Sequence, residues 1–218
     1  MRSHDCDALI VGAGMIGSAC ALALAQKGLS VIVLDKYAAH QDTLLEPQRV
    51  SAINQASENI LRNLSVWAGI AVSRPQPFER IEVWDAENTG MISFDAANMG
   101  LAHLGHIVRN NTISSALHQA LTVEPGVSLH FGDTPVAITS SGSSIAVELE
   151  RGETISARLL IGADGANSKV RELAGITHQE PAYGHTAIVA TVTPEAPHHS
   201  YARQRFLSSG PLAFLPLA

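Results

Sequence analysis

The sequence has few cysteines, no uninterrupted apolar run long enough to span a membrane, and no run of basic residues. Its two cysteines, Cys6 and Cys20, provide neither a disulfide framework nor the spacing of a metal site, which is typical of a reducing compartment. We therefore expect a cytoplasmic protein. Glycines interrupt the apolar stretch 8–25, and Asp5 and Asp7 precede it, so it predicts neither a signal peptide nor a membrane helix.

Charge is also sparse. Fourteen lysines and arginines against twenty aspartates and glutamates give a formal net charge of -6, and the basic residues are scattered along the chain. Because nucleic-acid binding needs positive charge gathered against phosphates, nucleic acid is not an expected partner. The hydrophobic content of 46% is that of a globular protein with a substantial core.

The first thirty-five residues predict a strand, a helix and a second strand. Residues 8–11 are a short apolar run, residues 15–26 are rich in alanine and leucine and stop at Gly28, and residues 30–34 read SVIVL. Two strands joined through a helix are typical of a parallel sheet in a doubly wound α/β fold.

Further elements are expected along the rest of the chain. Helices are predicted at 54–64, 113–121 and 168–173, and strands at 80–84, 91–94, 127–131, 136–139, 145–149 and 158–161. Beyond Gly175 three more strands are predicted, at 185–192, 201–206 and 212–217. We expect the hairpin at 78–104 and the strands after 176 to form one sheet.

Gly12, Gly14 and Gly17 satisfy the pattern G-x-G-x-x-G between the first strand and the first helix. In a dinucleotide site the first glycine permits a tight turn, the second lets the pyrophosphate approach the backbone, and the third lets helix and strand pack closely. The helix N-terminus then favours phosphate. Asp35, at the end of the second strand, can accept hydrogen bonds from a ribose and disfavours the 2'-phosphate of NADP.

The turn does not choose between FAD and NAD, because both share an ADP half. The alternative is that the glycines serve a tight turn alone and that Asp35 is an ordinary exposed charge. A second segment, LLIGADGANSKVR at 159–171, places an Asp-Gly pair after a buried strand and before a helix that Ser168 can cap. Taken alone, this segment is equally consistent with a plain strand-to-helix turn.

Together, the two segments resemble the fingerprints of the para-hydroxybenzoate hydroxylase-like flavin monooxygenases. The resemblance extends along essentially the whole chain and is strongest to the subgroup of ubiquinone-biosynthesis hydroxylases. It rests on LIVGAGMIG at Leu9, RVSAINQAS at Arg49, EVWD at Glu82, ISFD at Ile92, HLGHIV at His103, LIGADGANS at Leu160 and AFLPL at Ala213.

This resemblance implies a set of FAD contacts. The three glycines face the pyrophosphate, Asp35 holds the adenosine ribose, and Arg49 reaches the ribose or pyrophosphate. Asn110 stands where the wider group often has an arginine that touches the flavin; Arg109 beside it points the other way if it lies on a strand. The expected cofactor-binding residues are Gly12, Gly14, Met15, Gly17, Asp35, Lys36, Arg49, Asn110, Asp164 and Gly165.

The resemblance also implies the domain organisation. We expect an α/β fold with a Rossmann-like FAD-binding domain at 1–75 and 105–175, interleaved with part of a substrate-binding β-sheet domain at 76–104 and 176–218. The family's third fingerprint, a GDAAH-like run, does not occur here, and the chain ends within the apolar run FLPLA. A truncation at the C-terminus is therefore expected.

The implied activity is hydroxylation of a polyprenylated phenol or quinol in ubiquinone biosynthesis, through a C4a-hydroperoxyflavin formed after NAD(P)H reduces FAD. A lipid-embedded substrate implies peripheral docking at the inner membrane and association with other enzymes of that pathway. The alternatives are an FAD-dependent reductase or dehydrogenase of the same fold, or a non-catalytic nucleotide-binding fragment. The sequence identifies no general acid or base.

A metal site is not expected. His103 and His106 are three residues apart, a spacing that sends side chains on a strand to opposite faces, and the sequence shows no cysteine or carboxylate beside them.

Overall fold

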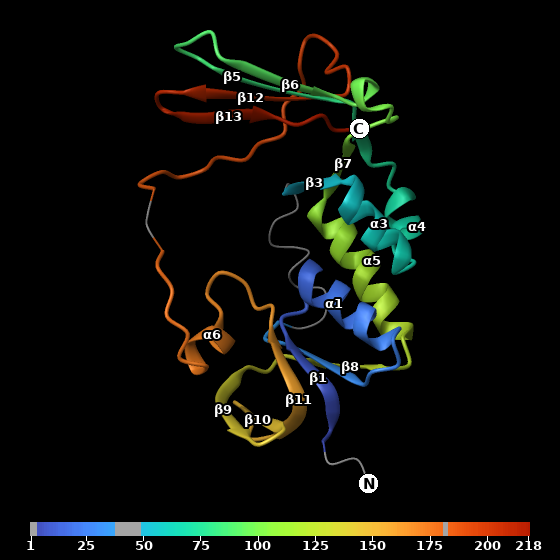
Figure 1. The fold of residues 1–218 in the computed structure, drawn as a ribbon, viewed down its shortest axis with the longest axis vertical. Coiled ribbons are helices and arrows are strands. Elements are labelled where there is room, and N and C mark those ends of the chain that lie inside the picture. Colours follow the sequence, from blue (N-terminus) through green and yellow to red (C-terminus); the bar gives the residue numbers. More distant parts are fainter. Residues whose placement is uncertain (1–3, 38–48, 181–182) are drawn as a thin grey trace. The chain divides into compact units, whose positions relative to one another are not determined.

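A computed structural model describes residues 4–37, 49–180 and 183–218. These residues form two compact units, each built from two stretches of chain (Figure 1). Unit 1 takes its described residues from 1–46 and 113–180, and unit 2 takes its described residues from 47–112 and 181–218.

Unit 1 contains a six-stranded sheet in the order β8-β2-β1-β11-β10-β9. Its strands are β1 (Cys6–Val11), β2 (Val31–Asp35), β8 (Val127–Phe131), β9 (Pro135–Ser141), β10 (Ser144–Leu149) and β11 (Thr154–Gly162). β2 pairs in parallel with both β1 and β8, and β11 pairs in parallel with β1. The strands β9 and β10 continue the sheet as an antiparallel extension. Four carboxyl ends therefore meet at one edge.

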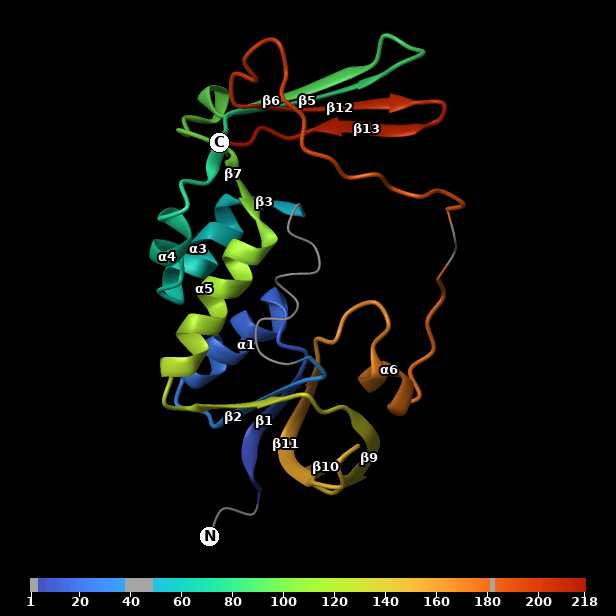
Figure 2. The same ribbon diagram turned by 180° about the vertical axis from the view of Figure 1, so that it is seen from behind.

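The core of unit 1 lies on both faces of the central strands. β1 is almost wholly buried, and Leu9, Ile10 and Leu34 are completely excluded from solvent, as expected of parallel strands covered on both faces. The helix α1 (Met15–Ala25) packs on β1, β2 and β8, and the short helix α6 (Lys169–Leu173) lies beside β9 and β11 (Figure 2).

Polar groups fasten the opposite edge of this sheet. The Asp7 carboxylate accepts hydrogen bonds from the backbone N–H and hydroxyl of Ser30, and Arg158 donates to its other oxygen. The Ser30 bonds are the main reason that the pKa of Asp7 falls to about 2. The amino ends of β1, β2 and β11 are thereby tied together.

Unit 2 contains two smaller sheets. One has the order β13-β12-β5-β6 and the other β3-β7-β4. The strands are β3 (Val50–Asn54), β4 (Gln76–Phe78), β5 (Arg80–Asp85), β6 (Met91–Asp95), β7 (Gly105–Arg109), β12 (Tyr201–Leu207) and β13 (Gly210–Phe214). The helices are α3 (Gln55–Asn63), α4 (Trp67–Ala71) and a single 3-10 turn, η1 (Ala97–Met99).

The helix α5 (Asn110–Val123) follows β7 directly and continues into unit 1. Its buried residues within unit 1 recur at helical spacing, and they are Ile113, Leu117, His118 and Leu121. The helix begins three residues before the predicted start.

Most predicted elements are present, but the strand at 185–192 is wrong. Residues 183–200 form no strand, and Ile188 and Val189 are largely exposed there. An apolar, β-branched run becomes a strand only when a neighbouring strand satisfies its backbone groups, and the described residues provide none for this run. Five elements were not predicted from the sequence: β3, α4, β4, η1 and β7.

The boundaries predicted for the two domains differ from those of the compact units. Residues 49–75 and 105–112, expected in the FAD-binding domain, belong to unit 2. The functions assigned to the two domains stay predictions. Among the described residues, no helix combines the length and apolar character needed to cross a membrane.

Candidate functional site

A pocket lies at the carboxyl edge of the unit 1 sheet, where β1, β2, β8 and β11 end. Its volume is about 230 Å³, and its lining residues come from the last residues of β1 and β2 and from the segments that follow the four strands. These residues are Val11, Gly12, Gly14, Asp35, Lys36, Asp133, Thr134, Pro135, Ala163, Asp164, Gly165, Asn167 and Lys169. In open α/β sheets this edge is where ligands bind.

The three glycines of the first turn have three different surroundings. Gly12 has a φ of +105°, and a Cβ there would lie 2.3 Å from the carbonyl oxygen of Ala163. A Cβ on Gly17 would lie 1.9 Å from the carbonyl oxygen of Gly12. A Cβ on Gly14 would meet no atom within 4 Å. The outer glycines are therefore needed for packing, whereas the middle glycine faces open space that a ligand can enter.

Asp35 holds the glycine turn from the neighbouring strand. Its Oδ2 accepts a hydrogen bond of 2.6 Å from the backbone N–H of Ala13, and its Oδ1 accepts one from the N–H of Tyr37. A carboxylate oxygen has room for a second donor, so Asp35 can position the turn and still accept from a ribose hydroxyl.

His118 of α5 reaches the same turn from within unit 1. Its Nε2 lies 2.6 Å from the carbonyl oxygen of Ala13 and donates to it, because a carbonyl oxygen can only accept. The ring is buried and packs edge-on against Phe131. Ala13 is thus fixed at its N–H by Asp35 and at its carbonyl by His118.

Asp164 follows β11, and its side chain is directed at the start of α6. Its Oδ1 accepts from the Ser168 hydroxyl, and its Oδ2 accepts from the backbone N–H groups of Lys169 and Val170. The Ser168 hydroxyl accepts in turn from the N–H of Arg171. The next residue, Gly165, has a φ of +85°, which explains why glycine stands there.

The pocket brings together six of the ten predicted cofactor-binding residues: Gly12, Gly14, Asp35, Lys36, Asp164 and Gly165. Met15 and Gly17 belong to α1, directly after the turn, and do not line the pocket.

The remaining two predicted residues, Arg49 and Asn110, belong to unit 2. Asn110 donates its backbone N–H to the carbonyl of Arg49, and its Oδ1 accepts from the Ser51 hydroxyl. Their contact with a cofactor stays a prediction.

Sequence reasoning missed the segment after β8, which contributes Asp133, Thr134 and Pro135 to the pocket. Val127–Phe131 was expected as a strand, but its pairing with β2 was not. Because β8 lies parallel to β2, the residues that follow it share an edge with Asp35. Asn167 and Lys169 were also missed, although both belong to the quoted segment LLIGADGANSKVR.

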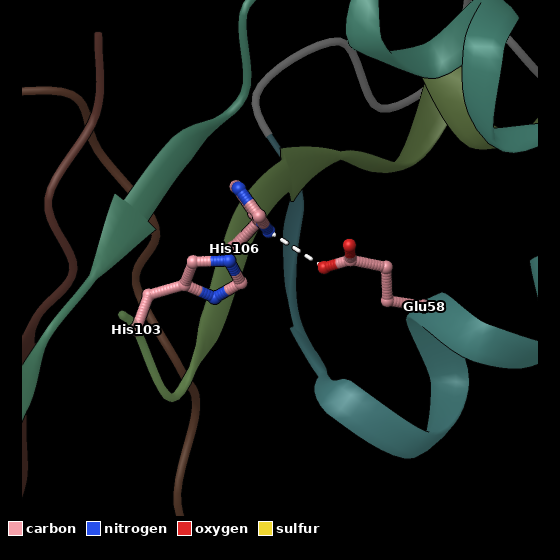
Figure 3. Close-up of side chains that lie close together, drawn as sticks. All are labelled: Glu58, His103 and His106. Carbon is pink, nitrogen blue, oxygen red and sulfur yellow. Dashed lines mark hydrogen bonds and ion pairs between the residues drawn. The ribbon is translucent and has the colours of Figure 1, made fainter. Parts of the chain in front are cut away.

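The expected separation of His103 and His106 is wrong. His103 lies before the first residue of β7, and the chain turns between the two residues, so strand alternation does not apply. Their ring centroids lie 4.4 Å apart. A carboxylate also joins them, because Glu58 Oε2 lies 2.9 Å from His106 Nδ1 (Figure 3).

Comparisons with known proteins agree with this site. A family model described as FAD binding domain matches residues 5–209. Over its whole length the chain is 39% identical to the 3-demethoxyubiquinol 3-hydroxylase of Escherichia coli (strain K12), of which it covers 56%. Over 97% of its length it is 35% identical to ubiquinone hydroxylase UbiL of Rhodospirillum rubrum, covering 49% of that protein. It is also 35% identical to the mitochondrial ubiquinone biosynthesis monooxygenase COQ6 of Homo sapiens, covering 48% of it.

The chain therefore spans about half the length of the curated relatives it matches. Solved structures agree on the fold. PqsL, a probable FAD-dependent monooxygenase from Pseudomonas aeruginosa, superposes with a TM-score of 0.74 at 20% identity, over 97% of this chain and 57% of that one. Aklavinone-11 hydroxylase, solved with FAD and aklavinone, gives a TM-score of 0.61 at 24% identity, over 80% of this chain and 36% of that one.

Proposed function

The chain belongs to the family of FAD binding domains, and from this premise we propose that the protein carrying it hydroxylates an aromatic ring in ubiquinone biosynthesis. The observation that carries the proposal is the 39% identity with a 3-demethoxyubiquinol hydroxylase across the entire chain. The pocket at the carboxyl edge of unit 1 supports it, because its glycine turn leaves the space that a dinucleotide phosphate needs.

The pocket suits the ADP half of FAD. Open space at Gly14 admits the pyrophosphate, and the start of α1 supplies N–H groups and the positive end of the helix dipole. Lys36 and Lys169 also line the pocket, together with three aspartates, and the Lys169 ammonium pairs with Glu172 at 2.8 Å. The volume of about 230 Å³ is below the range of a pocket that encloses a whole drug-sized ligand, so the remainder of FAD extends beyond these residues.

The residues around the turn would position the cofactor and leave its chemistry unchanged. Asp35 and His118 hold Ala13 from two sides, so the backbone that faces the phosphates is fixed before binding. Such preorganisation lowers the entropic cost of association. When bound, FAD supplies a ring that accepts electrons from a nicotinamide cofactor and activates oxygen for transfer to an electron-rich ring.

The proposed substrate is a polyprenylated phenol or quinol, and the proposed electron donor is NAD(P)H. The names of three relatives, which all refer to ubiquinone or ubiquinol, support this substrate class. A polyprenyl tail keeps such a substrate in the membrane. We therefore propose that the protein docks peripherally at the cytoplasmic face of the inner membrane and associates there with other enzymes of ubiquinone biosynthesis.

The proposal is tested with the intact protein that carries this chain. It should purify with bound flavin, consume NAD(P)H and oxygen with a prenylated phenol, and yield a product one oxygen atom heavier. Deleting its gene from a ubiquinone-producing host should cause a prenylated ring precursor to accumulate.

Three outcomes would count against the proposal. A colourless protein would exclude flavin chemistry. Oxidation of NAD(P)H with no oxygen in the product would favour a reductase or dehydrogenase. Unchanged ubiquinone in the deletion host would exclude the pathway while leaving FAD binding intact.

A further inference from the structure

Three potential metal ligands meet in unit 2: Glu58 of α3, His103 before β7 and His106 on β7. Each side chain offers one ligand atom, and these three atoms lie within 4.8 Å of one another. None of these residues lines the pocket of unit 1. Figure 3 shows both imidazoles beside the Glu58 carboxylate.

The Glu58 carboxylate is held in place from two directions. Its side chain is 7% exposed, and Oε1 accepts from both Nε and Nη2 of Arg62, at 2.9 Å and 2.6 Å. The other oxygen, Oε2, lies 2.9 Å from His106 Nδ1. Because a carboxylate only accepts, a proton on Nδ1 occupies the space between these two atoms. A metal ion can replace that proton.

Both imidazoles are partly buried. The His106 ring contacts the rings of Trp67 and His103, at centroid distances of 5.2 Å and 4.4 Å. His103 Nδ1 is buried, and no described residue provides it with a hydrogen-bond partner. Such an orphaned nitrogen is costly unless something else satisfies it.

One neighbouring positive charge opposes the binding of a cation. Arg62 is the unfavourable neighbour, but its side chain is 54% exposed, so water and salt screen its charge.

We propose that Glu58, His103 and His106 bind a divalent transition-metal ion, for which Zn²⁺ is the best match. Two imidazoles and one carboxylate are a ligand set of zinc sites with three protein ligands, and the fourth position is then taken by water. Imidazole selects for zinc and its neighbours in the first transition series and against Mg²⁺ and Ca²⁺, which prefer oxygen. When the metal binds His106 Nδ1, the ring proton moves to Nε2 by exchange with solvent, so the imidazole stays neutral.

The required movements are small. Zinc lies about 2.0–2.2 Å from nitrogen and oxygen ligands, so tetrahedral neighbours are roughly 3.3–3.5 Å apart. The pair of His106 and Glu58 has to open by about 0.5 Å from its present 2.9 Å. The other two distances are at most 4.8 Å, so each has to shorten by no more than about 1.5 Å. Arg62 stays on Oε1 and orients the ligand from outside, as the groups around metal ligands generally do.

The test is titration of the metal-free 218-residue chain with Zn²⁺ by calorimetry, with bound metal counted after dialysis. We expect a single tight site in the parent chain and an affinity at least tenfold lower in His103→Ala and Glu58→Gln. Co²⁺ bound in the parent chain should show the strong visible absorption of a four-coordinate ion. His130→Ala, which removes a partly exposed histidine from unit 1, is the matched control and should bind as the parent does.

His103→Ala is the decisive variant. Among the described residues, the His103 side chain makes a ring contact with His106. Its backbone carbonyl, which accepts from Gln55, is unchanged by the substitution. Circular dichroism verifies that each variant is folded. Failure of the folded parent chain to bind Zn²⁺, or an affinity within threefold of the parent in folded His103→Ala, would overturn the proposal. The cluster would then be a hydrogen-bonded link between α3 and β7.

Discussion

Two helices of unit 1 start at the same edge of the same sheet, but their first turns are completed differently. α1 follows β1 through Gly14, and no side chain caps it. α6 follows β11, and Asp164 and Ser168 together accept hydrogen bonds from three of its N–H groups. The first N–H groups of any helix have no partner within the helix. In α6 the chain provides the partners, and in α1 they are left to solvent or a ligand.

This difference shows that topology brings both turns to the pocket, whereas local side chains decide what each turn attracts. The uncapped start of α1 keeps the positive end of its dipole available to a phosphate. The Asp164 carboxylate neutralises the corresponding end of α6. We therefore expect the cofactor phosphates at α1, with the α6 turn serving mainly to shape the pocket wall.

The largest effect is expected from Gly17→Ala in the α1 turn. The new Cβ would stand 1.9 Å from the Gly12 carbonyl oxygen, which is backbone and cannot move without opening the turn. We expect a loss of more than about 3 kcal/mol of unfolding free energy, measured by urea denaturation.

Gly162→Ala, at the last residue of β11 before α6, is the matched change. Its Cβ would lie 3.0 Å from the Cβ of Val170, so Val170 has to shift by a few tenths of an ångström. A loss of about 1 kcal/mol is expected. Equal losses of stability in the two variants would show that the α1 and α6 turns are equally constrained, which would contradict the difference between them.

An intermediate effect is expected from Asp164→Ala. This change removes the acceptor for Lys169 and Val170 N–H, and we expect about 2 kcal/mol of destabilisation, read as a lower denaturation midpoint. Affinity for ADP, measured by calorimetry, should change less than threefold. A tenfold loss of ADP affinity in a folded variant would place the phosphates at α6 and contradict the comparison.

The smallest effect on stability is expected from Gly14→Ala. Gly14 has a φ of -66°, which alanine adopts without strain, and the new Cβ meets no atom. Stability should stay within about 1 kcal/mol of the parent. ADP affinity should nevertheless fall by roughly tenfold or more, because the methyl group separates the phosphates from the backbone N–H groups. Unchanged ADP affinity in this variant would refute the assigned pocket.

The α1 side of the comparison was predictable from sequence because its signals are local. The glycine spacing, the apolar strand before it and Asp35 at the end of the next strand lie within the twenty-eight residues 8–35, and the family resemblance supplied the cofactor. The roles of Asp35 and Asp164 as structural acceptors were not predictable, because each depends on which backbone N–H groups face the carboxylate. His118, more than a hundred residues from Ala13, gave no signal at all.

The other errors have one physical cause: each of these features depends on a contact between residues that lie far apart in the sequence. The residues at 185–192 have strand propensity but no described partner strand. Glu58 meets His106 across 48 residues because α3 packs on β3, which pairs with β7. His103 precedes β7, so strand alternation does not predict where its side chain lies. Asp133 enters the pocket only because β8 lies next to β2.

The pairing of β1 with β11 also sets the order in which the protein can assemble as it is synthesised. Val11 pairs with Gly162, so a central strand of unit 1 waits for 162 - 11 = 151 further residues before its second neighbour exists. At roughly 5–20 residues per second, that delay is about 8 to 30 s. During that time β1 presents an apolar open edge that can pair with other chains. A nascent chain of this kind depends on protection at the ribosome far more than one whose sheet closes locally.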